Sequence, residues 1–374
     1  MYHQTINFWF TLLRCIGMSP DRPKNYFTFI FIVTLGNIIF GLVLADFFYN
    51  PDASYMDAIE SIVLFSHMLS KTIAIFMFSK GIRRLSENLK NFWSFEDHEH
   101  LREDCYNKLI SLHKGAKMYL SYYVIGCSSI LMLPLVTSRT LPMYVYVPEA
   151  LGSNFIWALE TFTVPLLDLN VFSFDYLTFT FLQLTIMQFQ LLNSSISQLK
   201  FGKGQDNEKL KMQLAKIIRH HIFLLEFVRT LKQVTSMPLL VQLFNTVSAF
   251  CIELYLMRNH IDMGHALVGI LHSVVIFIQI CYFYCGPCQD VMDQGLKIAD
   301  TIYSINWCQL DDNKLKMYLK LIILMSNKEI IFSAAGFFRI NMATLVTVFK
   351  TSLSFYSFLL AMETKEGRVK TLAF

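Results

Sequence analysis

The apolar residues of this chain gather in long runs separated by polar segments. The hydrocarbon core of a lipid bilayer is about 30 Å thick, and an α-helix crosses it with about 20 residues. The runs of that length are Tyr26–Phe48, Met56–Phe78, Met118–Val136, Phe162–Leu184, Met237–Met257, Met263–Tyr284 and Met342–Met362. The pattern therefore predicts an all-α membrane protein with seven transmembrane helices.

The second and fourth runs are less uniformly apolar than the others. Their titratable positions are Asp57, Glu60, His67 and Lys71 in the second run, and Asp168 and Asp175 in the fourth. Ionisable groups are costly in hydrocarbon. We therefore expect these side chains to face protein or water rather than lipid.

The composition agrees with a membrane protein. Apolar residues make up 54% of the 374 residues and charged residues only 16%, whereas a soluble chain carries about 25% charged residues. The mean hydropathy is +0.43. So few charges cannot cover a soluble surface, and we expect membrane lipid around the molecule. The chain also lacks the basic stripe with interleaved aromatic residues that is typical of nucleic-acid binding.

The distribution of Lys and Arg outside the runs predicts the orientation. Alternate segments place 25 of these residues on the side of the N-terminus and 5 on the other side. Because cytoplasmic loops carry the excess of positive charge, the N-terminus is predicted to be cytoplasmic and the C-terminus extracellular. Residues 1–24 lack the apolar core of a signal peptide. They instead predict a short interfacial helix, whose apolar face consists of Phe8, Trp9, Leu12, Leu13 and Ile16.

Three cytoplasmic connections show apolar residues at three- and four-residue spacing between charges. These segments are Leu85–Phe95, Lys209–Leu231 and Asp311–Met325. The spacing is that of an amphipathic helix. We expect a layer of cytoplasmic anchor helices below the membrane.

Two motifs have the composition of chemical sites. Cys285-Gly286-Pro287-Cys288 has the spacing of a redox pair, but a βαβ unit is not predicted around it, so we interpret it as a turn at a helix end. The contiguous residues Glu96–His100 are better read as a solvated charge cluster than as a metal site, which needs ligands converging from fixed elements. We expect neither an enzyme nor a bound cofactor.

The last run carries a stripe of hydroxyl residues. Thr344, Thr347, Thr351 and Ser354 recur at spacings of three and four and share one helix face, which Phe358 and Met362 extend. Such a stripe either packs against other helices, with hydroxyls bonded to carbonyls one turn earlier, or lines a water-filled pore with a hydrophobic constriction. Periodicity alone leaves both interpretations open.

The C-terminal region resembles the signature of insect odorant receptors. The matching segments are Tyr303-Ser304-Ile305-Asn306-Trp307, Ala335-Gly336-Phe337-Phe338 and Lys350-Thr351-Ser352-Leu353-Ser354-Phe355-Tyr356. The family more often has Tyr-Ser-Tyr where this chain has Leu353-Ser354-Phe355. Weaker similarity extends over the rest of the chain.

The resemblance implies a subunit of a ligand-gated, non-selective cation channel in the plasma membrane of olfactory sensory neurons. Such a subunit forms a heterotetramer with a shared co-receptor. Its seventh span lines the pore, with Phe358 and Met362 at the constriction. The implied organisation has spans and ligand pocket in residues 1–284, anchor helices in 285–341, the pore helix in 342–362 and an extracellular tail in 363–374.

The resemblance also implies a pocket for a small volatile ligand in the outer halves of the second to sixth spans. The candidate lining residues are Ile59, Val63, Ser66, His67, Ser128, Met132, Leu133, Phe172, Phe250, Tyr255, Leu267 and Leu271. A mostly apolar cavity needs few polar anchors. We expect His67 and Tyr255 to supply them.

Three other functional classes remain to be compared with the channel. A G-protein-coupled receptor requires an extracellular N-terminus, which the distribution of Lys and Arg opposes. A transporter predicts an internal repeat, and none is visible in the sequence. The related gustatory receptor channels share fold and topology, and only the C-terminal signature separates them from odorant receptors.

Overall fold

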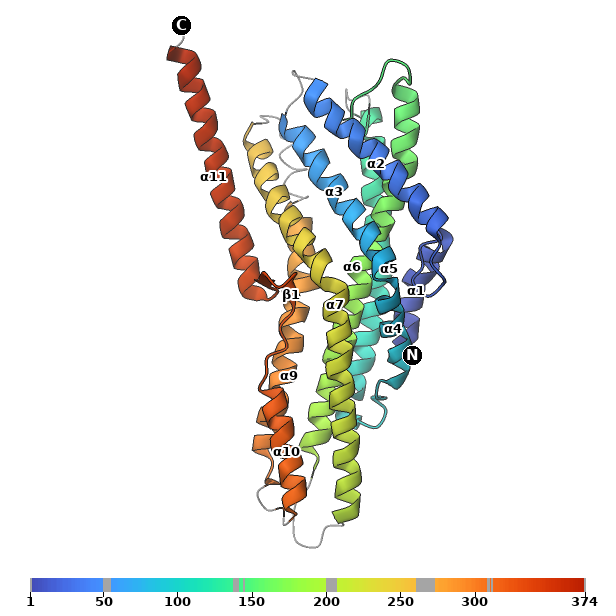
Figure 1. The fold of residues 1–374 in the computed structure, drawn as a ribbon, viewed down its shortest axis with the longest axis vertical. Helices are drawn as coiled ribbons and strands as arrows, with labels where there is room; N and C mark the ends of the chain where they lie inside the picture. The colour runs from blue at the N-terminus through green and yellow to red at the C-terminus, as the bar shows by residue number, and fades with distance from the viewer. Residues whose placement is uncertain are drawn as a thin grey trace.

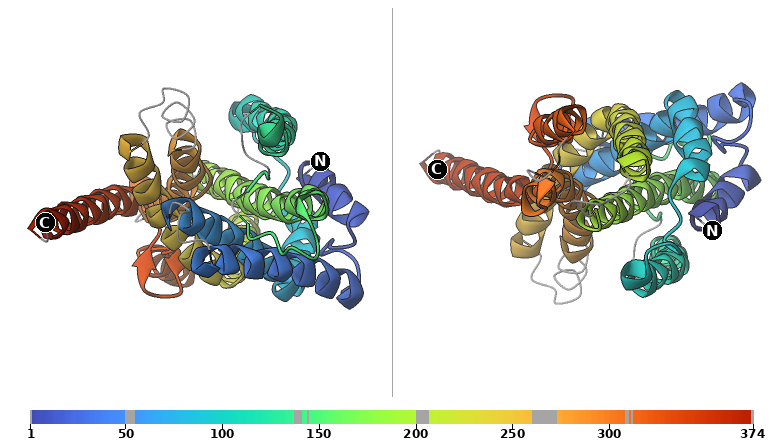
Figure 2. Two further views of the ribbon diagram at one scale, coloured as in Figure 1. Left: turned by 90° about the horizontal axis from the view of Figure 1, so that it is seen from above. Right: turned by 90° about the horizontal axis from the view of Figure 1, so that it is seen from below.

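The computed structural model describes residues 2–49, 55–136, 141–143, 145–199, 207–259, 273–307, 310 and 312–372. Within these residues nearly all of the chain is helical, and most helices run along one long axis (Figure 1). The upper part of the last helix stands apart from the others (Figures 1 and 2). The predicted all-α fold is confirmed.

The chain forms its helices in the following order, with one short hairpin before the last. The first half contains α1 (Tyr2–Cys15), α2 (Tyr26–Tyr49), α3 (Tyr55–Met77), α4 (Ser79–Asn88), the 3₁₀-helix η1 (Leu89–Asn91) and α5 (Glu99–Val136). The second half contains α6 (Ser153–Ser197), α7 (Asn207–Asn259), the π-helix η2 (Gln279–Cys285), α9 (Gly286–Ser304), α10 (Asn313–Ser326), β1 (Ser333–Ala334), β2 (Phe338–Arg339) and α11 (Met342–Leu372).

Several described helices are long and apolar enough to cross a membrane. These candidate spans are Tyr26–Tyr49, Ala58–Met77, Ser153–Ser197, Glu208–Tyr255, Ser273–Ser304 and Met342–Ala361. They overlap six of the seven predicted spans. One of these, Met263–Tyr284, is described only from Ser273 onward. The remaining predicted span, Met118–Val136, forms the C-terminal half of α5 and is helical throughout.

The helices α6 and α7 are much longer than a bilayer requires. They contain 45 and 53 residues, whereas about 20 residues cross the hydrocarbon core. Their lower ends continue past the other spans, where α9 packs on α6 and α10 packs on α9 (Figure 1). The expected helices Lys209–Leu231 and Asp311–Met325 correspond to the first part of α7 and to α10.

Two local expectations are wrong. The helix expected over Leu85–Phe95 ends early, because η1 stops at Asn91 and Phe92 adopts an extended conformation. The Gly286-Pro287 pair does not end a helix either, since the helical run continues from Ser273 to Ser304. Pro287, which lacks an N–H, lies directly after the π-helix η2 in the first turn of α9, where the winding of the helix changes.

The first helix packs inside the molecule with one apolar face. Ile6, Trp9, Phe10 and Leu13 are almost fully buried, and α1 lies against α5 and α6. Of the face expected from the sequence, Trp9 and Leu13 belong to this buried surface, whereas Phe8, Leu12 and Ile16 are partly buried beside it. The helix at the N-terminus is thereby fixed to the central helix α6.

The hairpin β1–β2 connects α10 to α11. Ser333 pairs with Arg339 and Ala334 with Phe338 in antiparallel register. The tight turn places Gly336 at φ 81°, a backbone conformation that glycine adopts without steric cost. The Ala335 N–H donates to the Ser236 carbonyl of α7 at 3.0 Å, so the hairpin fixes the base of α11 against α7.

Candidate functional site

A cavity of about 740 Å³ lies among α3, α5, α6, α7 and residues 275–283. Its volume is in the range that small organic ligands occupy. Most of its lining surface is hydrocarbon, and its aliphatic members are Val63, Leu64, Leu112, Val171, Ala249, Ile252, Val275, Ile276 and Ile278. The cavity is therefore suited to a small, largely apolar molecule.

Aromatic rings from three elements form one wall of the cavity. Tyr119 of α5 has its ring centroid 4.6 Å from Phe172 of α6 and 4.7 Å from Phe283 of η2. Tyr122 and Tyr123 approach Phe172 at 6.0 and 5.1 Å. Contacts at these separations are favourable ring pairs, and they fix the side chains of the wall relative to one another.

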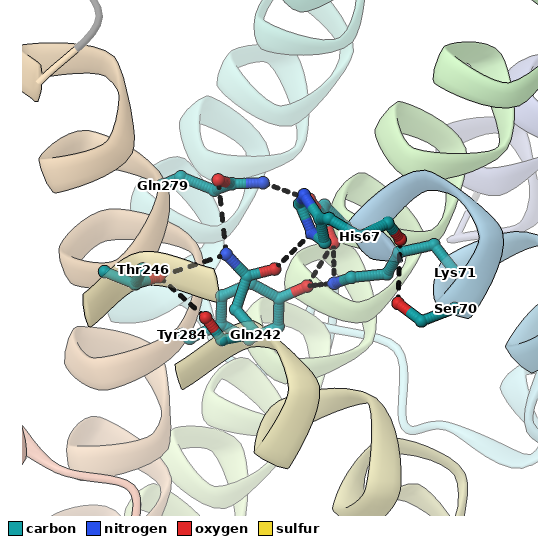
Figure 3. A network of polar contacts seen from close by, with 8 residues as sticks. His67, Ser70, Lys71, Gln242, Thr246, Gln279 and Tyr284 are labelled. Atoms are coloured by element: carbon teal, nitrogen blue, oxygen red, sulfur yellow. Dashed lines mark hydrogen bonds and ion pairs between the residues drawn. The ribbon is translucent and has the colours of Figure 1, made fainter. Parts of the chain in front are cut away.

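Polar side chains from α3, α7 and η2 gather at another part of the lining (Figure 3). His67 Nε2 lies 2.8 Å from Gln242 Oε1. The Gln242 side-chain amide donates to Gln279 Oε1 at 3.3 Å and to the Thr246 hydroxyl at 3.4 Å. All four residues line the cavity, so a ligand can exchange hydrogen bonds with this group.

A buried ion pair continues the network behind the cavity. The Lys71 ammonium donates to Asp175 at 2.5 Å and to the Tyr284 hydroxyl at 2.7 Å, and the Tyr284 hydroxyl donates to the same carboxylate. Gln279 Nε2 donates to the other carboxylate oxygen at 2.6 Å. The sequence-based expectation that Lys71 and Asp175 face protein rather than lipid agrees with this arrangement.

The π-helix η2 accounts for the convergence on Asp175. In an α-helix, two residues five positions apart point about 140° away from each other. In a π-helix the repeating hydrogen bond joins residues five apart, so such residues lie nearly above one another. Gln279 and Tyr284 are five positions apart at the ends of η2, and both donate to Asp175.

The predicted ligand residues divide into three groups. Val63, His67 and Phe172 line the cavity. Leu267 and Leu271, and the side chain of Leu133, lie outside the described part of the chain. The predicted residues that are described and do not line the cavity are Ile59, Ser66, Ser128, Met132, Phe250 and Tyr255.

Among this last group, individual contacts explain the placement. The Ser66 hydroxyl donates to Asn245 Oδ1 at 3.2 Å, and it is Asn245 that lines the cavity. Phe250 is buried and packs on Phe349 of α11 with ring centroids 5.1 Å apart. Met132 is 54% exposed on the outer surface of α5.

Other lining residues were not predicted. They include Tyr119, Tyr122, Tyr123, Gln242 and Gln279. The three tyrosines and Cys127 recur along α5 at helical spacing, and Gln242 and Thr246 are polar residues one turn apart inside an apolar run. Polar groups within a predicted span are a functional signal, and it points to these positions.

The predicted pore face of α11 does not pack within the described chain. Among the described side chains of this helix, Leu345, Val348 and Ser352 are buried, and the Ser352 hydroxyl donates to the Val247 carbonyl of α7 at 3.4 Å. Thr347, Ser354 and Phe358 are exposed, Thr344 and Thr351 are partly exposed, and the Met362 side chain lies outside the described residues.

The threonine hydroxyl groups of this face donate hydrogen bonds to nearby backbone carbonyls. Thr347 and Thr351 donate to the carbonyls four residues earlier at 3.1 and 2.8 Å, and Thr344 donates to the Arg339 carbonyl. This bonding is what the packing interpretation expected, whereas the exposure leaves the face free to contact water or another chain.

The cluster at Glu96–His100 contacts the lower end of α6. His98 Nδ1 and His100 Nε2 lie 3.3 and 2.8 Å from the Ser194 hydroxyl, and the His98 ring lies near that of Trp93. Burial, followed by the neighbouring His100, lowers the pKa of His98 below its usual value despite the opposing effect of Asp97. Part of the cluster is thus packed against protein rather than solvated.

These features define a multi-helix membrane protein that encloses a small-molecule-sized cavity near a buried polar network. The profile of the family described as 7tm Odorant receptor matches residues 53–353. The chain belongs to the odorant receptor family, which is a family of receptors and not of enzymes.

Comparison with solved structures supports the fold. The insect olfactory receptor OR5 from Machilis hrabei is similar with a TM-score of 0.77 and 17% identity, covering 95% of this chain and 97% of that one. The same receptor in complex with eugenol is similar with a TM-score of 0.72. The predicted seven-span fold with inverted topology is consistent with the insect receptors.

Curated relatives match a shorter part of the chain. Odorant receptor 82a of Drosophila melanogaster is 24% identical over 47% of this chain and 44% of its own length. Odorant receptor 10 of Aedes albopictus is 25% identical over 46% of each chain. The chain therefore spans somewhat less than half the length of these curated relatives.

Proposed function

We propose that this chain is the odorant-binding subunit of a ligand-gated, non-selective cation channel. The observation that supports this function best is the aromatic, mostly apolar cavity among α3, α5, α6, α7 and residues 275–283. The similar insect receptor solved with eugenol supports a small volatile molecule as the ligand.

The pore is assigned to α11, and the other subunits are the family's shared co-receptor in a heterotetramer. The hydroxyl stripe that Phe358 extends is exposed or partly exposed in this single chain, as expected of a surface that faces water at the centre of an assembly. The ligand binds the open arrangement more tightly and shifts the population toward it. The assembly operates in the plasma membrane of olfactory sensory neurons.

The test is ligand-evoked current in cells that express this chain with and without the co-receptor. We expect cation current in response to volatile molecules only when both chains are present. Silence of a surface-expressed assembly toward a broad volatile panel would overturn the channel function. Tags stained on each terminus of intact cells give a second readout, and an extracellular N-terminus would instead favour a G-protein-coupled receptor.

His67 and Tyr255 are the proposed polar anchors of the ligand. The His67 ring lines the cavity and is hydrogen-bonded to Gln242. Tyr255 lies further toward the C-terminal end of α7 and does not line the cavity. His67→Ala and Tyr255→Phe are expected to shift the half-maximal concentration without changing surface expression. Unchanged dose–response currents in both variants would refute the assignment of these anchors.

A further inference from the structure

We propose that the preferred ligands of the cavity are protonated amines, whose ammonium group binds the Asp168 carboxylate. The inference rests on the proposed function, because it assumes that the cavity among α3, α5, α6 and α7 is the ligand site. It goes further by naming the charge of the ligand and the residue that selects it.

The Asp168 carboxylate faces the cavity. Its side chain lines the cavity and is partly buried. Among the described residues its one hydrogen-bond donor is the Cys127 thiol, 3.5 Å from Oδ2. A thiol is a weak donor, so this contact compensates little of the hydration that the carboxylate loses in a hydrocarbon-walled site.

Aromatic residues of the cavity lining lie one helical turn from this carboxylate on α6 and from its thiol donor on α5. Phe172 lies one helical turn after Asp168 on the same face of α6, and its ring lies 5.1 Å from Tyr123 and 6.0 Å from Tyr122. The faces of aromatic rings attract cations within about 6 Å. A carboxylate beside several rings is the combination that recognises an alkylammonium group.

The lysines at the cavity and behind it are bonded to other side chains. Glu60 and Glu253 also line the cavity. Lys108, the lysine of the described lining, donates to Gln190 at 3.1 Å, and Lys71 is bound to Asp175 behind the cavity. Lys108 and Lys71 are thus each bonded to another side chain, and neither is bonded to the Asp168 carboxylate in the described structure.

An amine is therefore distinguished from a neutral molecule of the same shape. A carboxylate that lines an apolar cavity is stabilised by a hydrogen-bonded cation, whereas an alcohol donates a hydrogen bond without neutralising the charge. The hydrocarbon part of either ligand contacts the same apolar walls. The difference in potency between the two thus measures the contribution of the ammonium–carboxylate contact.

The experiment compares linear, branched and aromatic primary amines with the alcohols of the same carbon skeletons, in cells that express this chain with the co-receptor. We expect currents at lower concentration for amines than for their alcohols. Asp168→Asn is expected to raise the half-maximal concentration of the amines by about 10- to 100-fold and to leave responses to alcohols within about threefold. Asp293→Asn, which removes an exposed carboxylate on α9, is the matched control and should change neither.

Two further variants test the inference even if Asp168→Asn does not fold. Asp168→Glu keeps the charge and should retain the preference for amines, and Phe172→Leu removes a ring and should weaken amines more than alcohols. Responses to neutral volatiles without any amine preference would overturn the inference and leave the proposed function standing. Silence toward every volatile would overturn both.

Discussion

The Lys71 ammonium lies 2.5 Å from the Asp175 carboxylate, and both side chains are fully buried. The pair joins α3 to α6, and Tyr284 and Gln279 connect it to η2. Each charge depends on the other, because a lone buried ion would have neither water nor a counter-ion. The pair is thus a structural link between the ligand cavity and three helices.

We expect Lys71→Met to lower the free energy of unfolding by about 3–5 kcal/mol, since it leaves the Asp175 charge buried without its partner. Thermal unfolding of the detergent-solubilised protein measures the loss. The double variant Lys71→Met/Asp175→Leu should recover much of the stability. Arg84→Met, which removes an exposed ion pair with Glu226, is the control and should have an effect below about 1 kcal/mol. Equal losses in the single and double variants would contradict the prediction.

A second prediction concerns the packing of α2. A Cβ at Gly36 would lie 2.7 Å from Leu69 of α3 and 3.2 Å from Leu167 of α6, whereas nothing lies within 4 Å of a Cβ at Gly41. Gly36→Ala is expected to destabilise the protein by about 1–3 kcal/mol through overpacking. Gly41→Ala should be neutral or stabilising by up to about 1 kcal/mol, because alanine favours the helix. Similar melting temperatures for the two variants would show that α2 is not packed as described.

A third prediction concerns pH. Since the pKa of His98 is lower in the folded protein than in the unfolded chain, the unfolded state binds more protons as the pH falls below the unfolded value of about 6.5. The stability contributed by neutral His98 is therefore present above that pH and is lost on acidification. Between about pH 7.5 and pH 5.5 the melting temperature of the wild type should fall more than that of His98→Gln. An identical slope in both proteins would contradict this role of His98.

The fourth prediction concerns the proposed constriction. Phe358 and Leu353 are both exposed on α11 but point in directions about 140° apart. If Phe358 closes the water path by dewetting, Phe358→Ala should increase current in the absence of ligand or change single-channel conductance. Leu353→Ala should do neither. Unchanged closed-state current and conductance in Phe358→Ala would argue against a gate at this position.

The fold could be predicted largely from the sequence, because span length and charge asymmetry are properties of continuous segments. Titratable residues inside apolar runs also indicated which positions belong to the candidate site. Lys71, His67, Asp168 and Asp175 were expected to face protein or water, and all four belong to the cavity lining or to the network behind it. These signals need only local sequence and the cost of charge in hydrocarbon.

The cavity wall was harder to predict, because it depends on how each helix is rotated about its axis. Tyr119 and Met132 are both apolar or aromatic positions of α5, yet only Tyr119 lines the cavity. The π-helix was hidden for a related reason. Two of its residues, Gln279 and Tyr284, donate to Asp175 of α6, which lies more than a hundred residues away in the chain, and the local sequence does not predict such a contact.

The segment Gln279–Cys285 also has a consequence for the tolerated length of the chain. A single π-turn within a helix corresponds to one residue more than a regular α-helix would contain. Deleting one of the residues between Gln279 and Tyr284 would restore α-helical winding and leave the neighbouring loops at the same length. That deletion would leave Gln279 and Tyr284 four positions apart, about 40° around the axis of an α-helix, so both would still face Asp175. The π-turn is therefore the winding that accommodates one extra residue while both donors keep a shared acceptor.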